Sequence, residues 1–140
     1  MNLFIDTNVV IDYLADRQPF SEAAAELFQN AEQGIVTLFI SAVSYNNIYY
    51  ILRQSLTNAA TIKVLDELSD FTEIVDVNSP VIKKSLKSDF RDFEDAVQYN
   101  CALTVPKIKA IITRNEKDFK KSTVSVFSPA ELLAIINGEK

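Results

Sequence analysis

The sequence predicts an α/β fold, specifically a three-layer α/β/α sandwich around a mostly parallel sheet. Short apolar runs alternate with amphipathic helical stretches along the 140 residues, a pattern typical of parallel strands joined by helical crossovers. No hairpin dipeptide such as Asn-Gly separates two apolar runs, which disfavours antiparallel pairing. With 48% hydrophobic and 24% charged residues, residues 1–140 have the size and composition of a single domain.

The first eighty residues alternate between predicted strands and helices. In chain order these are a strand at 2–5, a helix at 6–16, a helix from 21 that ends at Gly34, a strand at 35–40, a helix at 41–54, a helix at 57–69 and a strand at 71–77. Leu3-Phe4-Ile5 is typical of a strand buried on both faces. Ser21 and Ser41 are good helix N-caps, because a serine hydroxyl accepts a hydrogen bond from a free backbone N–H group.

The remaining residues continue this alternation. In chain order they predict a helix after Ser79-Pro80, a helix at 92–103, a strand at 109–113, a strand at 124–127 and a helix that begins at Ser128-Pro129 and ends at Gly138. In both Ser-Pro pairs the serine is the expected N-cap and proline the first helical residue, where its missing N–H group matters least. No internal repeat or linker interrupts this order.

The residue inventory excludes several kinds of chemistry. The chain has one cysteine, Cys101, and no histidine, so disulfide frameworks, thiolate or imidazole zinc sites and Ser-His-Asp triads cannot be built. Its two glycines are too few for a glycine-rich phosphate loop or a dinucleotide-binding fingerprint. We therefore expect chemistry that uses carboxylates, hydroxyls, amides or cations, and a Cys101 that is a small buried hydrophobe.

The sequence contains no predicted export signal or membrane anchor. Its longest purely apolar run has five residues, Leu132–Ile136, and the N-terminus lacks a basic region and a long apolar stretch. A single thiol fits a reducing compartment. The sequence therefore predicts a cytoplasmic protein without membrane contact.

Charge is distributed unevenly along the chain, whose net charge is −5. Residues 1–80 hold three basic and eleven acidic side chains, whereas the remaining sixty residues hold eleven basic and eight acidic ones. An acidic protein can bind a polyanion when its cations are local to a groove and metal ions cover its carboxylates. The lysines are equally well explained as solvated helix faces, so both interpretations remain open.

Polar side chains follow several of the predicted strands. In an open parallel sheet, functional groups gather beyond the carboxyl ends of the strands, near the switch point in strand order. The polar residues expected near that edge are Asp6, Asn46, Asn47, Asn115 and Asp118, with Asp92 and Asp95 in the first turn of the 92–103 helix. Asp6 and Asp92 are also plausible N-caps. If the acids converge, their mutual repulsion favours a hard divalent cation with oxygen ligands.

Four blocks of sequence occur in an order that is shared with one family. They are Leu3-Phe4-Ile5-Asp6-Thr7-Asn8-Val9-Val10, Ile40-Ser41-Ala42-Val43-Ser44, Asp95-Ala96-Val97 with Ala102, and Ile111-Ile112-Thr113-Arg114-Asn115 with Asp118-Phe119. In these blocks the chain resembles a PIN domain, the ribonuclease fold of VapC-like toxins in bacterial toxin–antitoxin pairs. The resemblance extends from residue 1 to about residue 137.

The resemblance implies a nuclease that hydrolyses RNA phosphodiesters with Mg²⁺ or Mn²⁺. Transferred position by position, the catalytic and metal-binding acids are Asp6, Asp95 and Asp118, and Asp92 is available to a second ion. The positions implied to support the site are Thr7, Asn8, Asn47, Thr113 and Asn115. A bound ion of this kind would lower the pKa of a water molecule and stabilise charge on the phosphate.

Asn47 is the main departure from the family pattern. It falls where most PIN domains have a glutamate, so the site has one negative charge fewer, although an asparagine carbonyl can still ligate a hard cation. The alternative function is therefore a catalytically weakened PIN fold that binds RNA or protein. A phosphohydrolase or receiver domain fits less well, because Thr113-Arg114-Asn115 stands where a lysine would be needed.

RNA, an antitoxin and a second copy of the chain are the expected partners. Four cations flank the acidic residues in sequence and are predicted to contact RNA phosphates: Arg91, Arg114, Lys117 and Lys120. Tyr45, Tyr49 and Tyr50 can either stack on unpaired bases or pack in the core or a subunit contact. By resemblance we also expect a cognate antitoxin protein and a homodimer.

Overall fold

Five parallel strands form the central sheet in this computed structural model, which describes residues 1–138. They are β1 (Asn2–Ile5), β2 (Thr37–Ser41), β3 (Glu73–Val75), β4 (Ile108–Ile112) and β5 (Ser125–Phe127). Their spatial order is β3-β2-β1-β4-β5, and each neighbouring pair is parallel. The predicted parallel α/β fold is confirmed.

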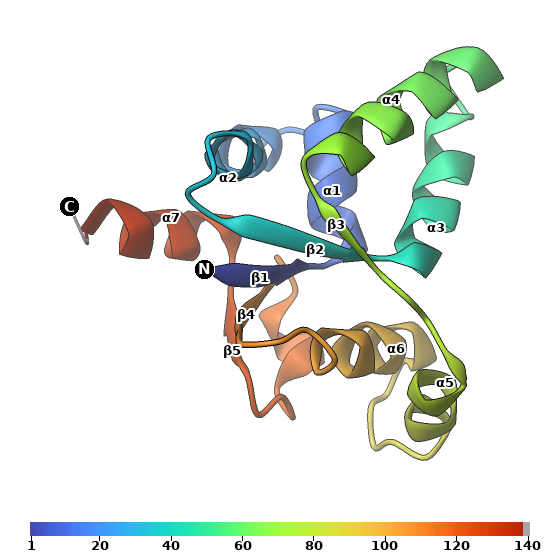
Figure 1. Cartoon of the computed structure of the whole chain (residues 1–140), viewed down its shortest axis with the longest axis vertical. Coiled ribbons are helices and arrows are strands. Elements are labelled where there is room, and N and C mark those ends of the chain that lie inside the picture. The colour runs from blue at the N-terminus through green and yellow to red at the C-terminus, as the bar shows by residue number, and fades with distance from the viewer. Residues whose placement is uncertain (139–140) are drawn as a thin grey trace.

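Helices cover both faces of the sheet (Figure 1). They are α1 (Thr7–Leu14), α2 (Ser21–Glu32), α3 (Ala42–Leu52), α4 (Asn58–Asp70), α5 (Ser79–Leu86), α6 (Phe93–Ala102) and α7 (Pro129–Gly138), with a short 3₁₀ helix η1 (Glu116–Phe119). In Figure 1 the helices α1 to α4 lie on one side of the sheet, and α5 and α6 lie on the other. The structure therefore has the three layers that the sequence predicts.

Each face of the sheet has its own apolar core, because side chains alternate along the buried strands. Leu3 and Ile5 of β1 pack with residues of α1, α2, α3 and α7 in one cluster, whereas Phe4 packs with α5, α6 and η1 in the other. All three side chains are fully buried. Cys101 belongs to the second cluster, and burial raises the pKa of its thiol to about 11. It is the buried hydrophobe that was expected.

Helix starts differ from the prediction at two places. Ser21 is the first residue of α2, not its N-cap, and its hydroxyl accepts a hydrogen bond from Gln18 Nε2 at 2.9 Å. The N-cap of α5 is Asn78, whose side chain accepts from the backbone of Val81, so the cap precedes the predicted Ser79 by one residue. Asparagine and serine cap equally well, and periodicity alone does not choose between adjacent candidates.

Two other predicted boundaries are confirmed. Ser41 caps α3 by accepting from the backbone N–H group of Ser44. Gly34 follows α2 with a φ of +78°, a left-handed conformation that glycine adopts without steric strain.

The switch point of the sheet lies between β1 and β4. The direction in which successive strands are added changes there. The strands β2 and β3 lie on one side of β1, and β4 and β5 lie on the other. The backbone N–H group of Asp6 donates to the carbonyl of Ile112 at 2.9 Å, which fixes the two strand ends side by side. Ligand sites of open parallel sheets form at such a point. None of the helices within residues 1–138 is long and apolar enough to cross a membrane.

Candidate active site

Asp6 is held rigidly at the end of β1. Its Oδ1 accepts a hydrogen bond from the backbone N–H group of Thr7 at 2.9 Å, and its Oδ2 accepts one from Thr113 Oγ1 at 2.8 Å. Burial raises the pKa of Asp6 above its usual value, and these two hydrogen bonds act in the opposite direction. Asp6 therefore caps α1, as one of its two interpretations predicted, and it also lines the cleft described below.

A buried polar network lies beside Asp6 and joins three helices. The hydroxyls of Thr7 and Ser44 are 2.6 Å apart, and Gln98 Nε2 donates to both of them, at 2.7 Å and 3.0 Å. These residues belong to α1, α3 and α6. Within the described chain, Gln98 Oε1 is buried without a hydrogen-bond partner. A connected network of this kind restricts how the three helix ends can shift relative to one another.

The N-terminal turn of α6 brings further carboxylates to the same edge. Asp92 is in the N-cap position but its side chain makes no capping hydrogen bond. Asp95 is half-buried, and desolvation followed by repulsion from Asp92, Asp6, Asp118 and Glu94 raises its pKa to about 7. Carboxylates that share one site in this way repel one another when they are ionised.

A cleft of about 490 Å³ collects these side chains. Its lining comprises Asp6, Thr7, Asn8, Ile11, Asn47, Tyr50, Ile51, Asp92, Glu94, Asp95, Asn115 and Asp118. The segments that meet there are distant in sequence, namely the end of β1, the helix α3, the start of α6 and the loop after β4 with η1. Thr113 does not line the cleft, but its hydroxyl donates a hydrogen bond to Asp6.

Glu94 is a cleft residue that the sequence analysis did not identify. Its Oε1 accepts a hydrogen bond from Asn47 Nδ2 at 3.4 Å. Burial and the charges of Asp92 and Asp6 raise the pKa of Glu94, and the hydrogen bond from Asn47 lowers it. The available signal was its position in the first helical turn, between Asp92 and Asp95, where the helix dipole favours negative charge.

The donor chemistry of the cleft fits a hard divalent ion. Five carboxylates and three carboxamides supply only oxygen ligands to such an ion, as Mg²⁺, Mn²⁺ and Ca²⁺ prefer. Among the described residues, however, no three acidic or cysteine side chains are placed so that they could hold a metal ion as they stand. The carboxylates would have to turn toward a common point to bind one.

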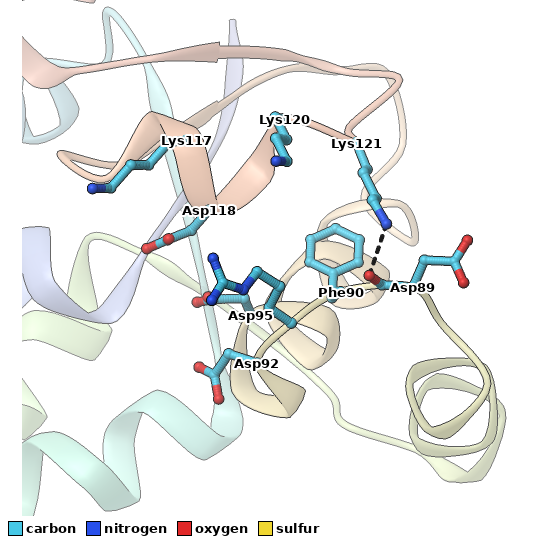
Figure 2. Close-up of a pocket in the computed structure, with 9 residues that line it drawn as sticks. Asp89, Phe90, Asp92, Asp95, Lys117, Asp118, Lys120 and Lys121 are labelled. Carbon is cyan, nitrogen blue, oxygen red and sulfur yellow. Dashed lines mark hydrogen bonds between the residues drawn. The ribbon is translucent and has the colours of Figure 1, made fainter.

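A second cleft of about 220 Å³ adjoins the first and adds cations to it (Figure 2). The two clefts share Asp92, Asp95 and Asp118. The second one is otherwise lined by Asp89, Phe90, Arg91, Lys117, Lys120 and Lys121. In Figure 2 the three shared carboxylates point to the same side, and Lys121 Nζ donates to the backbone oxygen of Asp89 at 2.9 Å. Arg91, which precedes α6, and the lysines of η1 and the residues after it therefore border the acidic cluster.

Comparison of the sequence with family models decides which family this is. A model described as PIN domain matches residues 2–117. The chain belongs to the PIN domain family. Among curated proteins, none matches this chain in sequence.

Solved structures similar to this PIN domain confirm the fold at low sequence identity. One is VapBC2 from Rickettsia felis bound to a promoter DNA fragment, with 16% identity, a TM-score of 0.64 and coverage of 91% of this chain and 98% of that chain. A toxin–antitoxin complex from Klebsiella pneumoniae has 22% identity, a TM-score of 0.66 and coverage of 91% and 97%. VapC20 of Mycobacterium tuberculosis, described as a toxin that cleaves the sarcin–ricin loop, has 14% identity, a TM-score of 0.61 and coverage of 78% and 86%.

One cation that was predicted to contact RNA has a partner inside the PIN domain. Arg114 Nε and Nη2 donate to the two carboxylate oxygens of Asp12 at 2.8 Å and 3.3 Å, and the guanidinium carbon lies 4.2 Å from the centre of the Phe20 ring. Arg114 lines neither cleft. Its guanidinium is therefore occupied by Asp12, and Arg91, Lys117 and Lys120 remain the predicted phosphate contacts.

The three tyrosines of α3 have different surroundings. Tyr50 is 64% exposed and lines the acidic cleft. Tyr45 is half-buried beside Thr72, and the Tyr49 hydroxyl donates to Asn58. Only Tyr50 of these three has a ring that an unpaired base could reach from the cleft.

Proposed function

We propose that this PIN domain is a metal-dependent endoribonuclease that hydrolyses RNA phosphodiesters with Mg²⁺ or Mn²⁺. The observation that carries the proposal is the meeting of Asp6, Asp95 and Asp118 in one cleft, without a cation of the protein to neutralise them among the ion pairs of residues 1–138. Acids that repel one another in this way favour the binding of a divalent ion.

Asp6, Asp95 and Asp118 would hold the ion, and Asp92 would be available to a second one. When bound, Mg²⁺ or Mn²⁺ supplies water activation and neutralises charge that develops on the phosphate. Asp6 contributes a carboxylate whose position is fixed by Thr7 and Thr113. A fixed ligand contributes to catalysis because less reorganisation is needed when the substrate binds.

The cationic border of the cleft would bind the RNA backbone. Arg91, Lys117 and Lys120 line the space that shares Asp92, Asp95 and Asp118 with the acidic cleft. A strand whose phosphates contact these cations would have its next phosphodiester close to the acids. Contacts of this kind position the strand without reading its sequence.

A binding module without efficient catalysis is the second candidate. Two observations favour it: α3 contributes Asn47, an amide, to the cleft, and no three acidic side chains of the described chain are arranged to hold an ion as they stand. Such a domain would bind RNA or protein through the same surface. Its stability would not respond to divalent ions.

We further propose that the domain is the toxin of a toxin–antitoxin pair. The support is the fold shared with the toxin–antitoxin complexes described above. An antitoxin segment that carries a basic side chain could neutralise the acidic cleft and block it. A homodimer is a further expectation from the family resemblance and is tested by measuring the molar mass in solution.

The proposal is tested by cleavage of a single-stranded RNA with Mn²⁺. We expect Asp6→Asn and Asp95→Asn to lower the rate at least about 100-fold, the size of effect seen when one preorganised charge-stabilising group is lost. Glu73→Gln, which removes an exposed charge on β3, is the control and should cleave like the wild type. Full activity of both cleft variants would refute the site assignment.

The same proteins distinguish the two candidate functions by thermal unfolding. A nuclease that binds Mn²⁺ in its native state should melt at a higher temperature when Mn²⁺ is added, because the ligand stabilises the state that binds it. RNA binding without cleavage and without this shift would support the binding module instead.

A further inference from the structure

The α3 side of the acidic cleft contains no charged side chain of its own. Its lining residues from α3 are Asn47, Tyr50 and Ile51. The carboxylates come from the other elements around the cleft. A cation bound there would therefore lack a charged ligand toward α3, unless a neighbouring element provides one.

Glu94 is the carboxylate that reaches α3. It belongs to the first turn of α6, yet its Oε1 lies 3.4 Å from Asn47 Nδ2, across 47 positions of sequence. A carboxylate only accepts hydrogen bonds, so the amide nitrogen of Asn47 must face Glu94. The amide oxygen of Asn47 is therefore turned away from Glu94.

This contact restrains a side chain that would otherwise be free to rotate. Glu94 is otherwise exposed at the cleft, and Asn47 is partly buried on α3. Since the restraint uses only one lone pair of Oε1, the rest of the carboxylate remains able to accept a ligand or a bound water. Asn47 thus directs a charge from α6 toward the side of the cleft where α3 has none.

We propose that Glu94 is a ligand of the divalent ion, directly or through a water, and that Asn47 is its positioning residue. This inference rests on the proposed function, because it concerns the same ion. It adds a carboxylate from α6 to the three proposed ligands Asp6, Asp95 and Asp118, and it gives Asn47 a role as a hydrogen-bond donor to that carboxylate.

Mn²⁺ affinity, measured by isothermal titration calorimetry on the full chain, tests the role of Glu94. Glu94→Gln can still accept from Asn47 but has no charge, and it should weaken Mn²⁺ binding by about 10-fold or more, as does loss of other metal-site partners. Glu73→Gln removes an equal charge at a residue that lines neither cleft, and this variant should bind like the wild type. Melting temperatures without metal verify that each variant is folded.

Exchanging the two residues gives a rescue test. The double variant Asn47→Glu and Glu94→Asn moves the carboxylate onto α3 and the amide onto α6, with no change in net charge. We expect it to recover most of the affinity that Glu94→Gln loses. Affinity as weak as that of Glu94→Gln would contradict the inference that the ion needs a carboxylate on the side of the cleft that α3 lines.

The positioning role of Asn47 is tested by non-additivity. Asn47→Ala should weaken Mn²⁺ binding when Glu94 is present and should have no further effect in a Glu94→Ala background, because its action passes through that carboxylate. Additive losses would show that Asn47 acts on the ion independently, which contradicts the inference.

The outcomes separate this inference from the proposed function. If Asp95→Asn abolishes Mn²⁺ binding while Glu94→Gln binds within twofold of the wild type, the metal site stands and Glu94 is not part of it. If the wild type binds no Mn²⁺, the metal-dependent function fails and this inference fails with it.

Discussion

Asp12 of α1 and Asp95 of α6 are both shielded from solvent to some degree, but of these two acids only Asp12 is paired with basic side chains of the protein. Asp12 is 1% exposed and receives Arg114 at 2.8 Å and Arg17 at 3.7 Å. Asp95 is half-buried beside four other acids, which together with desolvation raise its pKa to about 7. Both ion pairs found in residues 1–138 belong to Asp12.

The contrast shows which charges the fold itself neutralises. A buried carboxylate without a partner destabilises the native state by several kcal/mol in a typical protein, and the pairing of Asp12 removes that penalty. The cleft acids keep their repulsion, although Lys117 and Lys120 line an adjoining cleft. The divalent ion proposed above would relieve this repulsion.

The largest expected effect comes from breaking the neutralised pair. Arg114→Met leaves Asp12 buried with only the longer contact to Arg17, so we expect the free energy of unfolding to fall by about 3 kcal/mol, as for other broken buried ion pairs. Urea unfolding at neutral pH measures this change. Adding Asp12→Leu to the same variant should recover much of the loss, because no buried charge then remains unpaired.

Lys117→Met is the matched control for that experiment. Lys117 is an exposed cation three residues further along, with no ion pair among those of the described chain. Its replacement should change the free energy of unfolding by less than about 0.5 kcal/mol. Equal losses for the two variants would mean that Arg114 stabilises the fold no more than a surface cation does.

Removing a cleft charge should have the opposite sign and a smaller size. The folded-state pKa of Asp95, about 7, lies above its usual value of 3.8. Between these two pH values the unfolded chain has released the proton that the native state still holds. Stability from this group therefore falls as the pH rises from about 4 to about 7.

Asp95→Asn tests this linkage in metal-free protein. The variant should melt about 3 °C above the wild type at pH 7.5, which is about 1 kcal/mol for a domain of this size, and should match it near pH 4. Scanning calorimetry across that pH range measures the difference. With Mn²⁺ the order at pH 7.5 should reverse, because the ion stabilises the wild type. A difference that is independent of pH would show that Asp95 does not titrate in this range.

Much of the fold follows from local sequence signals. Leu3-Phe4-Ile5 predicts a strand buried on both faces, and its neighbours in the sheet are indeed β2 and β4. Asp6 and Asp118 follow predicted strands closely. Because the carboxyl ends of parallel strands lie at one edge of the sheet, these positions predicted that both residues would line the same cleft. The N-caps predicted at Ser21 and Ser79 were wrong by one residue each, because Phe20 and Asn78 hold the N-cap positions of α2 and α5.

The site residues that the sequence did not reveal depend on contacts between distant segments. The i, i+3 spacing that puts Asp92 and Asp95 on one helix face omits Glu94, whose contact with Asn47 depends on how α3 packs against α6. Arg114 adjoins Asn115, a cleft residue, yet it turns to Asp12, 102 positions away in sequence. The spacing of residues along one helix or strand cannot predict that Glu94 contacts Asn47 or that Arg114 contacts Asp12.

The smallest expected effect concerns the cations that border the cleft. If Lys120 contacts an RNA phosphate, Lys120→Gln should reduce the slope of log affinity against log salt by about 0.7, the value for one counterion released from a single strand. Binding of a short single-stranded RNA at several salt concentrations, in an Asp95→Asn background that prevents cleavage, measures the slope. Lys63→Gln removes the same charge from an exposed position on α4, so it changes the net charge without touching the cleft. A smaller slope for Lys120→Gln alone would assign the phosphate contact to the cleft border. Equal slopes for both variants would mean that RNA is attracted only by the overall charge of the protein and that the cleft border does not guide it to the acids.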